Sequence, residues 1–371
     1  MLPPNLAAPW NDLGNVYYGQ KRFDDAITAY EKAIRIDSRY KSAWNNLGNA
    51  LYAVKRVEEA NKAFDEAIAI DPEYASAWNG KGNIYYAKGQ YKEAIKAYEN
   101  AIDSDPRFFY AWNGLGNANV MLNNFKIALK AYKTSISLNK NYTEAYNNLG
   151  NLYRLMNRYK DAELNYKKAA SLNQNFIDPL IGLSYTYSRN NRLDEAIKIC
   201  KIAIDIDPKR VEPYNALAHA YLMMGDYSKA IEANKRANEL DPNNFLSLSG
   251  LATAYRLMDE TEDAIKMLEK AIKINPNICA AHISLAACYK KSHKRLEYET
   301  ELKLIQDLIN GESEYNRACF EAIMEKVDGA LKFLKIALEK DSSIKYWANK
   351  DPDFSFIRND AKFKEFMTSI S

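Results

Sequence analysis

Aromatic, small and apolar residues recur along the chain with a period of 34 residues. An aromatic residue marks each of the first four periods: Trp10, Trp44, Trp78 and Trp112. A small residue follows four positions later, beginning with Gly14, and a third series of alanines runs from Ala26 to Ala264 at the same interval. Three series that keep one phase over eight periods indicate a tandem repeat, in which every copy meets the same structural need.

Each period contains two stripes with helical spacing. With Ala7 as position 1, apolar or small residues at positions 4, 7, 8 and 11 form one stripe, and those at positions 20, 24 and 27 form another. Asp-Pro pairs such as Asp71-Pro72 end the second helix and start the next repeat, because the residue before proline avoids the helical region. One helix pair has too little core to fold alone, so we expect the repeats to stack.

The pattern divides the chain into five segments. We expect an N-terminal lead over 1–6, eight regular repeats over 7–278, a degenerate ninth repeat over 279–310, a tenth over 311–342 and a capping segment over 343–371. The ninth repeat is degenerate because Tyr298 replaces the expected alanine and two residues are lost before Ala330. The capping segment contains Phe363 and Phe366 in a short helix, which we expect to cover the apolar face of the last repeat.

The turn of the ninth repeat is basic. It contains Lys290, Lys291, Lys294 and Arg295. One interpretation is a solvated turn with an altered packing angle between repeats. The other is a hinge, or a docking point for an acidic partner.

The repeat signature is specific enough to suggest a family. The pattern W-x2-L-G-x2-Y, followed by A-x3-F/Y-x2-A and a proline, resembles the tetratricopeptide repeat and extends from residue 7 to about residue 342. The resemblance implies an all-α fold, a right-handed superhelical solenoid of antiparallel helix pairs whose first helices line a concave face. The tail resembles a terminal segment of many prokaryotic repeat arrays. The family implies a scaffold that binds protein, without identifying the partner.

Asparagines form two ladders on the first helices of repeats 1 to 5. Positions 2, 5, 9 and 12 share one face by their 3–4 spacing. Position 5 carries Asn11, Asn45, Asn79, Asn113 and Asn147, and position 9 carries Asn15, Asn49, Asn83, Asn117 and Asn151. Position 12 carries Tyr18, Tyr52, Tyr86, Val120 and Arg154. Asparagine is a poor helix former, so its use at fixed positions needs another cause.

These ladders suggest a site for an extended peptide. A side-chain amide donates and accepts together, so it can bracket a peptide group, and the position-12 tyrosines add amphipathic contact area. Gly80 and Gly114, at position 6, would leave room for a close approach. The stretch looks similar to the repeat domain of O-linked N-acetylglucosamine transferase. The peptide-binding set comprises all the asparagines of both ladders with Tyr18, Tyr52, Tyr86 and Arg154. The alternative is that the asparagines bond neighbouring helices.

The stripe changes from repeat 6 onwards, where the asparagine ladder stops after Asn151. Position 9 becomes Tyr185, His219, Thr253 and Ala287. We therefore infer two functional regions, a neutral polar groove in repeats 1 to 5 and a mixed one in repeats 6 to 9.

Charge, hydropathy and cysteine spacing each exclude certain partners or cellular compartments. The 51 basic and 48 acidic residues leave a net charge of +3, which argues against nucleic acid; single-stranded RNA stays a weaker alternative, since related helical repeats read single strands. The sequence has no apolar run of membrane-spanning length and no signal-peptide pattern, so we expect a cytoplasmic protein without a membrane partner. The four cysteines are irregularly spaced and are expected to be buried thiols: Cys200, Cys279, Cys288 and Cys319.

Catalytic and metal-binding motifs are absent from the sequence. The three histidines, His219, His282 and His293, lack metal-ligand spacing, and no nucleophile elbow or phosphate-binding loop occurs. We therefore expect no enzymatic activity, cofactor or metal. A second hypothesis is self-assembly into a homo-oligomer through an uncapped N-terminal end that includes Leu2 and Leu6.

Overall fold

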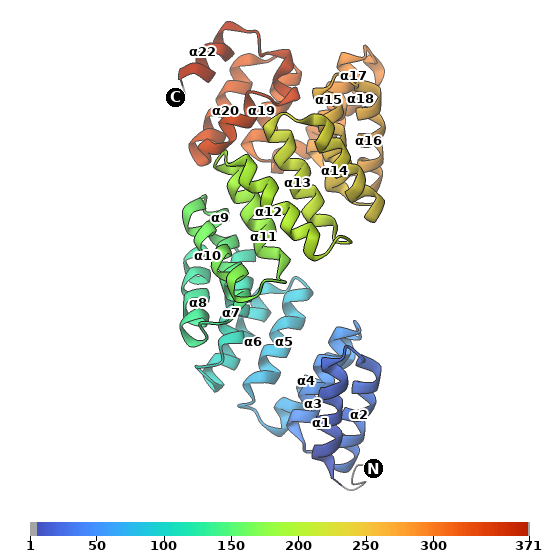
Figure 1. Ribbon diagram of the computed structural model, residues 1–371, viewed down its shortest axis with the longest axis vertical. Helices are drawn as coiled ribbons and strands as arrows, with labels where there is room; N and C mark the ends of the chain where they lie inside the picture. Colours follow the sequence, from blue (N-terminus) through green and yellow to red (C-terminus); the bar gives the residue numbers. More distant parts are fainter. Residues whose placement is uncertain (1–5, 370–371) are drawn as a thin grey trace. The chain divides into compact units, whose positions relative to one another are not determined.

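The computed structural model describes residues 6–369, which form helices joined by short turns, and no strand occurs within that range (Figure 1). The helices of repeats 1 to 5 are α1 (Ala7–Gly19), α2 (Phe23–Ile36), α3 (Lys41–Ala53), α4 (Val57–Ile70), α5 (Ala75–Ala87), α6 (Tyr91–Ser104), α7 (Phe109–Met121), α8 (Phe125–Leu138), α9 (Thr143–Leu155) and α10 (Tyr159–Leu172). Those of repeats 6 to 9 are α11 (Ile177–Arg189), α12 (Leu193–Ile206), α13 (Val211–Met224), α14 (Tyr227–Leu240), α15 (Phe245–Leu257), α16 (Thr261–Ile274), α17 (Cys279–Lys291) and α18 (Arg295–Leu308). The chain continues through η1 (Ile309–Gly311), α19 (Glu314–Ile323), α20 (Val327–Lys340), η2 (Ser342–Ile344), α21 (Lys345–Ala348), η3 (Pro352–Phe356) and α22 (Ala361–Ser369).

The helices belong to two compact units, residues 1–155 and residues 156–371. The boundary falls inside the fifth repeat, after α9. Within each unit, the first and second helix of a repeat pack together and the second helix packs on the first helix of the next repeat, except that α19 packs more on α17 than on α18. The expected all-α array of helix pairs is therefore confirmed.

The turn within each repeat depends on one residue with left-handed backbone. Position 15 has a positive φ in every repeat, from Lys21 (φ 60°) and Lys55 (φ 64°) to His293 (φ 58°). The corresponding residue of the tenth repeat is Glu325, which lies 32 rather than 34 residues after His293. The two missing residues therefore fall between these turns, and α19 is correspondingly short.

The junction between repeats is closed by side-chain hydrogen bonds. Asp37 Oδ1 accepts from the backbone N–H of Arg39 at 2.9 Å, and an Asp or Asn does the same at the end of each later repeat to Asn275. In several repeats the residue at position 4 also donates to the carbonyl of the turn, as Trp44 Nε1 does to Ser38 at 2.9 Å and Trp78 Nε1 does to Pro72 at 2.9 Å. These local bonds explain why both positions recur.

Glycines at positions 6 and 8 make room for the aromatic ring at position 24. A Cβ at Gly82 or Gly114 would lie 2.4 Å from the ring of Tyr98, and a Cβ at Gly80 would lie 2.4 Å from that of Phe64. The expectation that Gly80 and Gly114 leave room for a ligand is therefore wrong. The space beside a position-6 glycine is filled by the ring of the preceding repeat, and the space beside a position-8 glycine by the ring of its own repeat, which makes the close helix packing possible.

The C-terminal residues build a core of their own on the last repeat. Phe354 and Phe363 are buried together with Ile323, Leu334 and Met367. No helix among residues 6–369 is both long and apolar enough to cross a membrane. All four cysteines are buried and free, as expected.

Candidate functional site

All fourteen residues of the expected peptide site lie in the first unit. They come from the first helices of repeats 1 to 5, which are α1, α3, α5, α7 and α9. Each of these helices contacts the next one in the series. The structure therefore brings the three expected positions into parallel rows, but it gives each row a different environment.

The position-5 row is mostly buried between neighbouring first helices. Asn11, Asn45, Asn113 and Asn147 are only 5–7% exposed, and Asn79 is half-buried. Position 5 was expected to line an open groove, but these four side chains are buried, because adjacent first helices approach closely enough to cover them.

Some of these buried amides bond to the next repeat. Asn46 Nδ2 donates to Asn11 Oδ1 at 2.9 Å, and Asn148 Nδ2 donates to Asn113 Oδ1 at 3.1 Å. In those two cases position 6 of the following repeat is asparagine. The alternative interpretation, bonding between neighbouring helices, therefore applies to Asn11 and Asn113.

The position-9 row is more open, and its amides are held in place by tyrosines. The hydroxyl of Tyr30 donates to Asn15 Oδ1 at 2.9 Å, and that of Tyr98 donates to Asn83 Oδ1 at 2.8 Å. Tyr132 and Asn117 repeat the contact at 2.7 Å. Because the oxygen accepts the phenol proton, the Nδ2 amide hydrogens remain available as donors.

Burial keeps these phenols protonated. It raises the pKa of Tyr30 to about 12 and raises the pKa values of Tyr98 and Tyr132 further. Asn15 and Asn83 are exposed, and Asn117 is half-buried. Asn49 differs, because Phe64 occupies position 24 of its repeat and has no hydroxyl to donate.

The position-12 tyrosines pack against the start of the second helix. Tyr18 meets the ring of Phe23 edge-on, with 5.4 Å between centroids, and Tyr86 lies 5.5 Å from Tyr91. Arg154, at the same position of repeat 5, is half-buried, and its Nε is buried without a hydrogen-bond partner among the described residues. The row thus combines flat aromatic surface with one cation.

An aromatic cluster at the start of repeat 4 was not expected from the sequence. Tyr110, at position 2 and 47% exposed, lies 4.1 Å from the ring of Phe109 and 5.3 Å from that of Tyr142. It belongs to the same face as positions 5, 9 and 12. The three consecutive aromatic residues at 108–110 are the sequence feature that could have predicted this cluster.

Sequence models of the tetratricopeptide repeat match three stretches of the regular part of the chain, residues 14–123, 143–176 and 189–288. A model described as TPR repeat matches residues 14–55 and 82–123. Models described as tetratricopeptide repeat match residues 42–74, 63–96, 143–176, 189–253 and 221–288. The chain belongs to the tetratricopeptide repeat family.

Three solved structures resemble the chain at low sequence identity, and the first of them shares its fold. A chain of the APC/C hetero-tetramer Cut9–Hcn1 is 20% identical over 74% of this chain, with a TM-score of 0.61. This chain spans about half of that one, 54% of its length. YrrB, described as a TPR protein with an unusual peptide-binding site, is 27% identical over 51% of this chain and 97% of its own, with a TM-score of 0.39. PilF of Pseudomonas aeruginosa is 19% identical over 56% and 94%, with a TM-score of 0.49. A comparison with curated proteins found no match.

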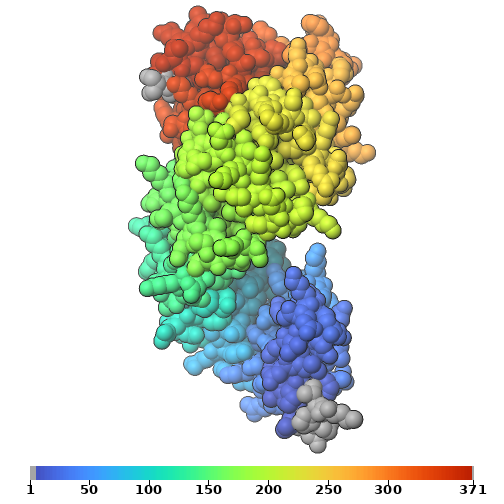
Figure 2. All heavy atoms as spheres, viewed as in Figure 1, coloured from blue at the N-terminus to red at the C-terminus, as the bar shows by residue number. Residues whose placement is uncertain are grey.

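The tetratricopeptide repeats of the second unit are covered on their first helices by the C-terminal segment, defined here as residues 341–369. Tyr346 Oη and Lys350 Nζ both donate to the carbonyl of Met223 in α13, each at 3.0 Å. Arg189 of α11 contacts Asp341 at 3.5 Å. Figure 2 shows this segment, in red, directly against the green-yellow and gold surface of repeats 6 to 9. The mixed groove expected in repeats 6 to 9 is therefore occupied, at these positions, by the chain itself.

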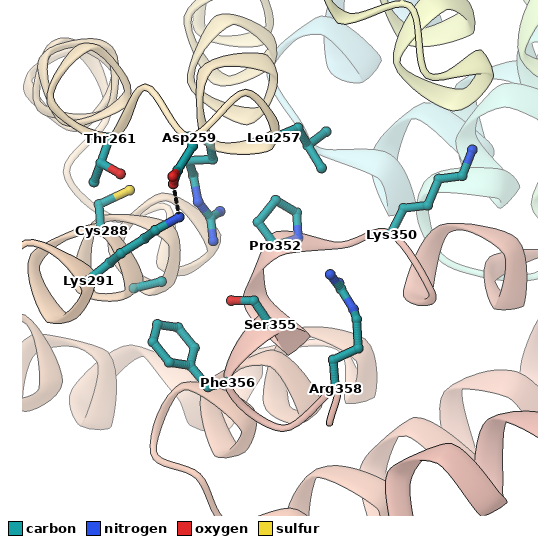
Figure 3. A pocket seen from close by; sticks show the side chains of 12 residues that line it. Leu257, Asp259, Thr261, Cys288, Lys291, Lys350, Pro352, Ser355, Phe356 and Arg358 are labelled. Carbon is teal, nitrogen blue, oxygen red and sulfur yellow. Dashed lines mark ion pairs between the residues drawn. The ribbon is translucent and has the colours of Figure 1, made fainter. Parts of the chain in front are cut away.

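A basic hollow of about 320 Å³ lies where this segment meets repeats 8 and 9 (Figure 3). Its four cations already have partners within the chain. Arg256 pairs with Asp353, Lys291 with Asp259, Lys350 with the Met223 carbonyl, and Arg358 with the Asp351 carbonyl. Carboxylates therefore neutralise Arg256 and Lys291, whereas Lys350 and Arg358 are held by carbonyl groups and keep their charge.

The cations in the basic turn of repeat 9 are paired with acidic side chains of the same chain. Lys290 pairs with Glu325 at 2.7 Å, and Lys294 pairs with Glu262 at 2.9 Å. Arg295 pairs with Glu299 of its own helix at 2.8 Å. A docking point for an acidic partner is not supported here, because the chain supplies the acids.

Three buried groups, Cys319, Asp351 and Asp353, are the candidate metal ligands among residues 6–369. Asp353 already faces the guanidinium of Arg256 at 2.5 Å, and Asp351 accepts from the hydroxyl of Tyr315 at 2.8 Å. Arg256 therefore supplies the counter-charge that a metal ion would otherwise provide.

Proposed function

We propose that this tetratricopeptide array is a protein-interaction scaffold whose first unit binds an extended segment of a partner protein. Family membership supports the scaffold role in general. The observation that carries the peptide site is the set of tyrosine-held amides at Asn15, Asn83 and Asn117. Their donor hydrogens form one row along the first helices, and peptide carbonyls are the natural acceptors for such a row.

The energetics favour a moderate affinity. Each amide that is already held in place contributes about 0.5–1.5 kcal/mol when it bonds a carbonyl, and fixing it beforehand lowers the entropic cost. The exposed ring of Tyr110 adds an anchor for an apolar side chain at the end of the row. A complex in roughly the micromolar range follows from a few such contacts.

A selection experiment tests this proposal without a known partner. A displayed library of unstructured peptides is selected on the full chain, and the footprint of a selected peptide is measured by hydrogen exchange. Protection of α1, α3, α5 and α7 is expected. Peptides that protect only the second helices α2, α4, α6 and α8 would contradict the proposal.

Self-assembly is a second candidate function, favoured by one observation at the start of the array. Val16 is 53% exposed, whereas the residues at the same position of the next two repeats, Ala50 and Ile84, are 0% and 1% exposed. Leu6 is 56% exposed, and Leu2 lies outside the described residues. A scattering mass that doubles with concentration and returns to one chain in Val16→Lys supports end-to-end association. A single-chain mass at every concentration argues against it.

A further inference from the structure

A second hollow lies in the second unit, on the first helices of repeats 6 to 8. Its volume is about 490 Å³, within the range of small-ligand pockets. Helices α11, α13 and α15 form its walls, and Trp347 of the C-terminal segment covers part of it. It depends on no part of the peptide site, which belongs to the first unit.

Repeat 7 departs from the early repeats at position 24, beside this hollow. Position 24 is aromatic in repeats 1 to 5 and is Cys200, Asn234 and Leu268 in repeats 6 to 8. In repeat 3 the ring of Tyr98 lies against Gly114 and its hydroxyl bonds Asn83. The equivalents in repeat 7 are Asn234 against Gly250, with His219 in place of the asparagine, and all three line the hollow.

Three polar atoms of the lining residues have no partner. They are Asn215 Oδ1, His219 Nδ1 and Asn234 Nδ2, and each is buried without a hydrogen bond among the described residues. Asn215 and Asn234 are 6% and 2% exposed. Buried polar groups are nearly always bonded, so an acceptor and a donor left open beside one hollow point to a bound ligand.

The electrostatics of the hollow favour a neutral ligand. Burial and the nearby charge of Arg189 lower the pKa of His219 to about 4, so its imidazole is neutral near pH 7 and can accept a hydrogen bond from a hydroxyl. Arg189 itself is engaged by Asp341 and by the hydroxyl of Ser343 at 3.4 Å. The ring of Tyr185 lies 5.5 Å from His219 and adds aromatic wall.

We infer that this hollow binds a phenol ring adjoining an amide, the chemistry of a tyrosine side chain within a peptide. The ring lies in the hollow beside Asn234, against the rings of Tyr185 and Trp347, and its hydroxyl bonds His219. The adjoining amide donates to Asn215 and accepts from Asn234. The ligand thereby gives position 9 of repeat 7 the bond that the Tyr98 hydroxyl gives Asn83 in repeat 3.

Calorimetric titration of the full chain with N-acetyl-L-tyrosinamide tests the inference. Saturable binding is expected, and N-acetyl-L-phenylalaninamide should bind about tenfold more weakly because it leaves His219 unpaired. The natural ligand could be a tyrosine within a peptide or a free small molecule, and the blocked tripeptide Gly-Tyr-Gly distinguishes the two. Tighter binding of the tripeptide than of N-acetyl-L-tyrosinamide indicates a peptide, and weaker binding indicates a free small molecule. Absence of saturable binding by all three probes overturns the inference.

Two variants locate the binding. Asn234→Tyr combined with Ala218→Gly gives repeat 7 the ring and the glycine of repeat 3, so that the new hydroxyl bonds His219, and it should abolish binding of the tyrosine probe. Leu296→Tyr, at a side chain that is 76% exposed, is the control for an added tyrosine and should bind normally. Unchanged affinity in the filled double variant would overturn the inference.

If the double variant does not fold, His219→Phe gives an independent answer. It keeps an aromatic ring but removes the ring nitrogens, so it should erase the preference for the tyrosine probe over the phenylalanine probe. A preference that persists in His219→Phe excludes the proposed bond.

Discussion

Arg256 and Asp353 form an ion pair in which Nη2 lies 2.5 Å from Oδ1, with side chains only 8% and 10% exposed. The two residues are 97 apart in sequence, and they join the first helix of repeat 8 to the C-terminal segment. Arg256 also donates to the hydroxyl of Ser284 at 2.8 Å. Because this ion pair is buried, the C-terminal segment is part of the core of the second unit.

Removal of one partner from this ion pair should destabilise the second unit. Asp353→Ala leaves the guanidinium of Arg256 buried without its counter-charge, which costs about 3–5 kcal/mol. Urea unfolding measures the loss. Asp25→Ala is the control, because its pair with Arg22 is about half exposed on both sides and should contribute less than about 1 kcal/mol. Equal losses in both variants would contradict the buried pairing.

Asp351 gives the second unit a defined pH dependence. Burial, then the neighbouring charge of Asp353, raises the pKa of Asp351 to about 6. The folded state therefore holds this proton more tightly than the unfolded state, and the stabilisation present below pH ~4 is lost as the pH rises through about 6. The side chain of Asp351→Asn does not titrate, so this loss of stability with rising pH is absent. Its amide oxygen can still accept the hydrogen bond from the Tyr315 hydroxyl.

The variant should therefore gain stability relative to the wild type between pH 4.5 and 7.5, by about 1–3 kcal/mol. Urea unfolding midpoints at the two pH values give the comparison. A difference between variant and wild type that does not change with pH would show that Asp351 stays ionised throughout.

The glycine at position 6 has a steric role that substitution can measure. Gly114→Ala places a Cβ 2.4 Å from the ring of Tyr98, so the helices must separate, at a cost of about 1–3 kcal/mol. Gly19→Ala is the matched control, because no atom lies within 4 Å of its added Cβ. Alanine is the better helix former, so thermal unfolding should show Gly19→Ala unchanged or slightly more stable. Equal melting temperatures for the two variants would exclude the close packing.

The helix pairs follow from the sequence because each repeat closes its own local bonds. Position 24 faces position 9 of the same repeat, and the 15-residue spacing of Asn15 and Tyr30 recurs in Asn83 and Tyr98. That pairing was present in the sequence as a signal. What periodicity alone did not show is the burial of position 5, because it depends on how closely neighbouring first helices approach.

The contacts of the C-terminal segment had no such signal. Lys350 bonds a carbonyl 127 residues away, and residues 343–371 carry no repeat from which a partner surface could be inferred. The hollow beside Asn234 could not be predicted from the sequence either. The departure of Asn234 from the aromatic pattern was visible in the sequence, but the hollow beside it depends on the distant Trp347.

The peptide site of the first unit depends on donor hydrogens, and these can be removed without removing the tyrosine contacts. Asn83→Asp and Asn117→Asp keep an oxygen for the hydroxyls of Tyr98 and Tyr132 but replace the outward donor with a carboxylate. Asn100→Asp with Asn141→Asp, both exposed and off the first helices, makes the same charge change elsewhere.

The most direct measurement is the dissociation constant of a selected peptide for these two double variants and the wild type. We expect the Asn83→Asp, Asn117→Asp chain to bind at least about tenfold more weakly, the loss of two bonds, and the control to bind as the wild type does. Equal affinities for both double variants would contradict recognition by the position-9 amides.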